Sequence, residues 1–184
     1  MIVQITKTLS LEDRMQWRAW LVSHHTTVSE IWLISYGKDS NHRSIPYLHA
    51  VEEALCFGWI DGIAKRMDNE RSAQRFTPRR PKSHWTELNK ERARRLIASG
   101  QMTEAGFAKL PDLNLEAFHI TPDILAALQD DPQTWAHFQT FPPVYQRIRI
   151  GFIEEVRRQP EVFQKRLAHF LKNTHKNKMF GTMI

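Results

Sequence analysis

The chain has 184 residues, of which 41% are hydrophobic and 25% charged, a balance that excludes a disordered chain and is typical of a globular protein. No stretch approaches the ~20 apolar residues of a membrane span, and no export signal opens the sequence. The single cysteine, Cys56, excludes an internal disulfide. We therefore expect a cytoplasmic protein. The formal net charge of +6 favours anionic partners without selecting among them.

The first third of the chain predicts helices alternating with a short strand. Residues 11–23 predict a helix, because Ser10 provides an N-cap before an acidic first turn and apolar residues recur at helical spacing. Residues 29–36 predict a buried strand, since a β-favouring apolar run ends at a glycine. A second helix is expected over 46–57, with one apolar face and Gly58 at its C-cap.

A basic segment follows the second helix. Residues 59–77 predict a β-hairpin, because two runs of alternating polarity flank a polar turn. Pro78 and Pro81 make further strand pairing improbable. Ser83 then opens a predicted helix that ends at Gly100.

The remaining sequence predicts helices that are separated by prolines and turn residues. Their expected ranges are 103–109, 122–129, 132–140, 143–158 and 160–173. Together these patterns indicate an α+β fold, in which a small antiparallel β-sheet of about three strands packs on helices and the C-terminal half is mainly helical.

The length favours a single domain over residues 1–184. Within it we expect an α/β core over 1–100, a helical region over 101–174 and a flexible tail over 175–184, because the tail is basic and then apolar without any periodicity.

Positive charge is concentrated in one part of the sequence. Residues 62–95 contain 11 Lys and Arg against 4 Asp and Glu, whereas the rest of the chain contains 15 against 16. Guanidinium groups beside aromatic rings and a helix N-terminus are suited to a phosphate, a carboxylate or an unstacked base. The alternative is a hairpin whose charges are simply solvated.

This segment and the turn before it supply the predicted ligand-binding residues. They are Trp59, Asp61, Lys65, Arg75, Phe76, Arg79, Lys82, Ser83 and Trp85. Asp61 lies in a glycine-flanked turn, where its backbone and carboxylate could face a ligand, and it is the weak candidate for a catalytic acid or base. The alternative for this turn is a helix C-cap followed by a tight turn, with Trp59 in the core.

The sequence predicts no metal and no cofactor. It contains no P-loop, dinucleotide-binding glycine pattern or paired-cysteine spacing. The helical stripe of His49, Glu52, Glu53 and Cys56 is enzyme-like in composition. However, His49 and Cys56 are separated by about 10.5 Å along a helix axis, too far for a nucleophile and its base or for two ligands of one zinc ion.

Several motifs together resemble the YdeI/OmpD-associated, or bacteriocin-protection, family. They are residues 51–62 (VEEALCFGWIDG), residues 75–83 (RFTPRRPKS), Trp85 followed by residues 89–92, and residues 102–106. A weaker resemblance extends over the C-terminal helices, although residues 158–163 depart from the family pattern. The resemblance implies stress resistance through protection against antimicrobial peptides, and it implies no catalytic residue.

Three functional hypotheses follow from the sequence. The leading one is a cytoplasmic binding or stress-protection protein that engages an anionic small molecule or a nucleic acid through Arg75, Arg79 and Lys82. The second is an enzyme acting on a small phosphorylated or carboxylated substrate, with Asp61 as acid or base. The third is a protein-interaction module whose apolar tail, residues 179–184, docks on a partner or on a second copy. The sequence leaves open whether the protein is an enzyme and its oligomeric state.

Overall fold

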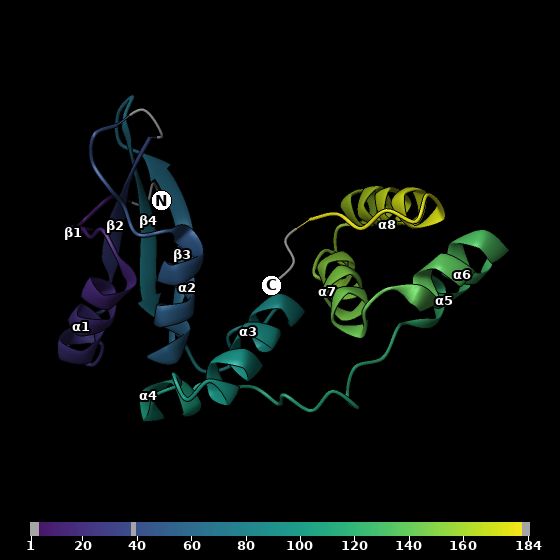
Figure 1. The fold of residues 1–184 in the computed structure, drawn as a ribbon, viewed down its shortest axis with the longest axis horizontal. Helices are drawn as coiled ribbons and strands as arrows, with labels where there is room; N and C mark the ends of the chain where they lie inside the picture. The colour runs from purple at the N-terminus through teal and green to yellow at the C-terminus, as the bar shows by residue number, and fades with distance from the viewer. Residues whose placement is uncertain (1–3, 38–39, 182–184) are drawn as a thin grey trace. The chain divides into compact units, whose positions relative to one another are not determined.

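The computed structural model describes residues 4–37 and 40–181, which form two compact units (Figure 1). We call residues 1–83 with 93–110 the sheet unit, and residues 84–92 with 111–184 the helical unit. The prediction of an α+β fold with a mainly helical C-terminal half is confirmed. Among the described residues, no helix combines the length and the apolar character needed to cross a membrane.

The sheet unit contains a four-stranded mixed sheet in the order β1-β2-β4-β3. The strands are β1 (Thr8–Ser10), β2 (Ile31–Tyr36), β3 (Trp59–Arg66) and β4 (Arg71–Pro78). The hairpin formed by β3 and β4 confirms the hairpin predicted from sequence. The prediction of about three antiparallel strands was one strand short, because β1 has only three residues and pairs in parallel with β2. So short a segment carries no sequence periodicity of its own.

Two helices pack on one face of this sheet. They are α1 (Arg14–His24) and α2 (Tyr47–Cys56). The ring of Trp17 lies 5.6 Å from that of Phe76 on β4, and Trp20 meets Trp59 on β3 edge-on at 5.9 Å. Aromatic rings of this size contribute much of the buried apolar area.

The start of α1 differs from the sequence prediction. Asp13 rather than Ser10 is the N-cap, and its carboxylate accepts a hydrogen bond from the Gln16 amide at 2.9 Å. Both residue types are favoured N-caps, so local preference alone does not choose between them. Ser10 instead ends β1 and lies 3.3 Å from the hydroxyl of Tyr36 on β2.

The opposite face of the sheet is the basic face, which we define by Lys65, Arg71 and Arg75. Directly paired residues of neighbouring strands share a face. Lys65 pairs with Ala73, which shares its face with Arg71 and Arg75 because alternate residues of a strand point the same way. These cations therefore lie on the face opposite to Phe76, away from α1 and α2.

Two further helices follow the hairpin. Helix α3 (Glu87–Ala98) begins four residues later than the predicted start at Ser83, and α4 (Glu104–Phe107) is a single turn capped by Thr103. Residues 87–92 of α3 belong to the helical unit and residues 93–98 to the sheet unit.

Within the described residues, four helices lie wholly in the helical unit, and each starts with a proline at its first or second position, where the missing N–H costs nothing. They are α5 (Pro122–Gln129), α6 (Pro132–Thr140), α7 (Pro143–Glu154) and α8 (Pro160–His175). Their core includes Ile124, Leu128, Phe138, Tyr145, Ile150, Ile153, Phe163 and Phe170.

The tail after α8 contributes one residue to this core. Phe180 packs against it, and its backbone N–H donates to the Tyr145 hydroxyl at 3.2 Å. Residues 182–184, the end of the apolar tail proposed to dock on a partner, lie outside the described residues.

Candidate functional site

The net positive charge of the sheet unit lies in its hairpin and the loop that follows. Residues 62–83 contain 7 Lys and Arg against 2 Asp and Glu, while the rest of the unit contains 8 of each sign. The hairpin and loop therefore carry a net charge of +5, and the remainder of the unit is neutral. A segment of this kind attracts anions over a Debye length of about 8 Å at physiological salt.

Arg75 is engaged in an ion pair on the basic face. Its guanidinium donates from Nε to Glu30 at 2.5 Å, and Glu30 also accepts from Thr6 at 2.6 Å and from the Trp32 indole at 3.2 Å. The hydrogen bond from Thr6, followed by that from Arg75, holds the pKa of Glu30 below its usual value against the effect of burial. The charge of Arg75 is therefore partly neutralised within the protein.

Arg79 is a buried residue. Only 2% of it is exposed, and its backbone N–H donates to Gly58 at 2.8 Å. Burial lowers the pKa of Arg79 to about 10, and the negative charge of Asp61 opposes that shift. A side chain in this position supports the fold around the end of β4, and it does not present its charge on the surface.

Asp61 is held by α2. Its carboxylate accepts a hydrogen bond from the hydroxyl of Tyr47 at 2.5 Å. Four of the cavities in the described residues have linings that do not include Asp61, Arg75 or Arg79. These four cavities therefore do not bring the three residues together in the kind of pocket that an enzyme with an anion clamp requires.

The other predicted site residues are dispersed. Trp59 and Phe76 are buried in the core of the sheet unit, and the Trp59 indole donates to the His25 carbonyl at 3.2 Å. Lys82 is exposed in the loop with a left-handed φ of 61°. Ser83 closes that loop, since its N–H and its hydroxyl both donate to the Arg80 carbonyl, at 3.1 and 2.7 Å.

Trp85, the last of the predicted residues, lines a cavity of about 680 Å³ in the helical unit. Its polar lining contains cations and anions, including Lys90, Arg158, Glu87 and Glu155. The volume is in the range of small-molecule sites, and the mixed charges suit a polar ligand without a single dominant charge. Sequence reasoning missed this cavity because its walls come from three separated segments, residues 84–90, 112–121 and 151–159.

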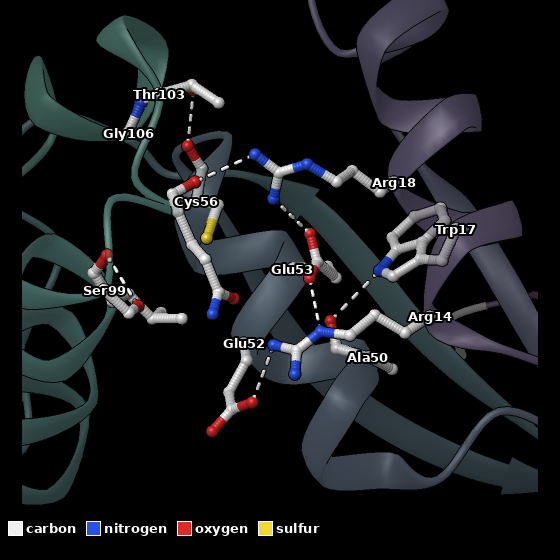
Figure 2. Close-up of polar contacts among 12 residues, drawn as sticks. Arg14, Trp17, Arg18, Ala50, Glu52, Glu53, Cys56, Ser99, Thr103 and Gly106 are labelled. Carbon is white, nitrogen blue, oxygen red and sulfur yellow. Dashed lines mark hydrogen bonds and ion pairs between the residues drawn. The ribbon is translucent and has the colours of Figure 1, made fainter.

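A charged cluster around the buried Glu53 lies between α1 and α2 (Figure 2). Glu53, which is 1% exposed, accepts from Nε of Arg14 at 2.5 Å and from Nη1 of Arg18 at 2.7 Å. Arg14 also donates to Glu52 at 2.8 Å, and Arg18 to the Gln101 carbonyl at 2.9 Å. The two arginines bind the same carboxylate, so the cluster fixes α1 against α2.

Cys56 lies beside this cluster and is buried. Burial raises the pKa of its thiol to about 11, and the charge of Glu53 adds to the shift while Arg18 opposes it. Its carbonyl accepts from the Thr103 hydroxyl at 2.5 Å. A thiol in this environment is protonated at neutral pH and is a poor nucleophile.

We expect Cys56 to react with iodoacetamide at pH 8 at least about 100-fold more slowly in the native protein than in urea, because the thiolate population falls tenfold for each unit by which the pKa exceeds the pH. Mass spectrometry of timed samples measures both rates. Equal rates in the native and unfolded protein would show that the thiol is accessible and ionised.

Within residues 4–37 and 40–181, no group of three His, Cys, Asp or Glu side chains is placed to hold a metal ion.

The fold and these sites define a two-unit α+β protein with a basic sheet unit and a helical second unit. Residues 9–109, more than half of the chain, match the family described as a domain of unknown function, DUF8412, and the chain belongs to that family. Residues 117–177 match the family described as bacteriocin-protection, YdeI or OmpD-associated, which confirms the resemblance predicted from sequence. No curated protein and no solved structure matches the chain.

The first match lies mainly in the sheet unit but includes residues 84–92 of the helical unit, and the second lies within the helical unit. The motifs that first suggested the resemblance lie in the region of the first match; they are residues 51–62, 75–83, 85, 89–92 and 102–106. The bacteriocin-protection match instead covers α5 to α8 of the second unit. The weaker part of the predicted resemblance is thus the part that matches the named family.

Proposed function

We propose that this protein is a cytoplasmic binding protein that engages an anionic polymer through residues 62–83. The observation that carries the proposal is the distribution of charge, since this segment holds the whole net charge of the sheet unit. Counter-ion release from a polyanion supplies the main driving force for binding at such a surface.

The geometry supports an extended partner over a small one. Lys65, Arg71 and Arg75 share the basic face, and Arg80 and Lys82 are exposed in the adjoining loop. Cations spread over a sheet face and a loop match the repeated phosphates of a nucleic acid better than one compact headgroup. The small-substrate enzyme has less support, because the carboxylate of Asp61 accepts a hydrogen bond from Tyr47 and Arg75 is paired with Glu30.

The match of residues 117–177 to the bacteriocin-protection family leads us to propose that the binding serves protection against antimicrobial peptides. Such peptides are commonly cationic, and a protein with a net charge of +6 repels them. We therefore propose that protection is indirect and acts through the anionic partner.

The test is fluorescence anisotropy of short single-stranded RNA and DNA, titrated with the whole chain at low and moderate salt. We expect salt-sensitive binding that the double variant Arg80→Ala, Lys82→Ala weakens, with a salt slope reduced by about 1.4 if two phosphate contacts are lost. The matched control is Lys172→Ala, Lys176→Ala, which removes two exposed cations from the end of α8 in the helical unit.

Arg79→Ala is unsuitable as a test because it deletes a buried side chain. Equal weakening by the loop variant and by the α8 control would mean that only total charge matters, and would contradict the assigned segment. Absence of binding at low salt would exclude nucleic acid and direct the search to small anionic metabolites.

A further inference from the structure

The helical unit contains a small apolar groove between α7 and α8. Its walls are formed by Phe152, Ile153, Val162, Phe170 and Phe180, and its volume is about 190 Å³. Apolar cavities of about 150 Å³ hold a benzene molecule. The groove therefore has room for one aromatic ring or a short alkyl chain.

Two walls of the groove are open to solvent. Phe152 is 39% exposed and Val162 is 36% exposed, although both lie on helices that bury other apolar residues in the core. The helical periodicity of α7 predicts that Phe152 faces inward with Tyr145 and Ile148, whereas the structure places it at the groove. Apolar side chains left exposed around a concave site are a recognised mark of a binding surface.

The rim of this groove is cationic. Arg149, Lys165, Arg166 and His169 line it together with the apolar residues. Arg166 is fixed in place, because it donates to the Phe152 carbonyl and its guanidinium carbon lies 3.7 Å from the centroid of the Phe152 ring. It also forms an ion pair with the carboxylate of Glu155 at 3.9 Å.

Arg149 adds a second guanidinium beside the same apolar surface. Its guanidinium carbon lies 5.4 Å from the Phe152 ring and 5.6 Å from the Phe180 ring. Arg149, Lys165 and Arg166 thus surround a groove whose walls are mainly hydrocarbon. A ligand with an apolar group and a positive headgroup would be repelled here. A ligand with a negative headgroup gains both the apolar contact with the groove and the ionic contact with its rim.

We propose that this groove binds an amphiphilic monocarboxylate, with its alkyl chain or aromatic ring between Phe152, Val162 and Phe180 and its carboxylate at Lys165 and Arg166. This site is separate from the polyanion surface of the sheet unit and does not depend on it. Burial of the apolar body supplies affinity, and the cationic rim selects the sign of the headgroup.

The test uses octanoate as the probe and octylammonium as the matched control, both below their micelle concentrations, with the whole chain. Backbone and methyl NMR spectra follow the residues of the groove during each titration. We expect octanoate to shift the signals of Phe152, Val162 and Phe180 in a saturable way, and octylammonium to leave them unchanged. Equal shifts with both probes, or no saturable shift with octanoate, would overturn the proposal.

Two variants locate the site. Val162→Trp fills the groove and is expected to abolish the octanoate shifts. Lys165→Glu reverses a charge on the exposed rim and is expected to weaken octanoate binding about fivefold, the upper effect of an exposed charge pair. Lys172→Glu makes the same charge change further along α8, outside the lining residues.

An equal loss for Lys165→Glu and Lys172→Glu would show a general effect of net charge and contradict a defined headgroup position. Circular dichroism first checks that Val162→Trp is folded. If the folded variant still binds octanoate, the alkyl chain lies elsewhere and the proposed site is wrong.

Discussion

Replacing Arg14 and Arg18 together by methionine is expected to lower the free energy of unfolding by about 4 kcal/mol, the largest effect that we anticipate for the sheet unit. Both arginines bind Glu53, at 2.5 and 2.7 Å, and the Glu53 side chain is only 2% exposed. Without them its carboxylate is buried with no cation beside it. Urea denaturation followed by tryptophan fluorescence measures the change.

The matched control is the triple variant Arg14→Met, Arg18→Met, Glu53→Met. It removes the carboxylate together with its partners, and apolar replacement of a whole buried ion cluster is often neutral or stabilising. We therefore expect the triple variant to regain most of the stability that the double variant loses. A triple variant as unstable as the double one would show that the loss comes from packing of the arginine stems and not from the unpaired charge.

The second large effect is expected for Gly106→Ala, which should destabilise the protein by about 3 kcal/mol. A methyl group at this position would overlap the Cys56 carbonyl group, whose carbon would lie only 2.8 Å away, and the sulfur of Met102. The carbonyl belongs to the backbone and is fixed by two hydrogen bonds from Thr103, so it cannot easily retreat. Thermal unfolding followed by circular dichroism measures the loss.

Gly100→Ala provides the control for this variant. Gly100 has a left-handed φ of 69°, and nothing lies within 4 Å of the position that a methyl group would take. Its substitution is expected to cost only about 1 kcal/mol of backbone strain. A Gly106→Ala variant no less stable than Gly100→Ala would mean that the contact between α4 and the C-terminal end of α2 adjusts freely.

The local patterns of the sequence were sufficient to predict most of the helices and strands. Prolines start α5 to α8 at or near the predicted residues, because proline removes only an N–H that the first helical turn leaves unbonded. The hairpin was also predictable, since alternating polarity around a polar turn has few other solutions. The predicted start of α3 was four residues too early, because Ser83 closes a loop by donating to the Arg80 carbonyl instead of capping the helix.

The candidate sites were less predictable, because burial and ion pairing depend on residues far away in sequence. Nothing around Arg75 indicates Glu30, which lies 45 residues earlier, and nothing around Arg79 indicates that it is buried. The stripe of Glu52, Glu53 and Cys56 was visible in the sequence. The ion-pair partners of the two glutamates, Arg14 and Arg18, could not be predicted from the sequence, because they come from another helix.

The sequence by itself determined the fold class, the helical second half, the basic character of residues 62–95 and the resemblance to the bacteriocin-protection family, since each depends on composition, short-range periodicity or a local motif. Only the tertiary structure decided which charges are buried or paired, how β1 joins the sheet, and where the cavities lie. Those features arise where segments distant in sequence meet, and side-chain packing at such junctions is set by long-range contacts that no local pattern encodes.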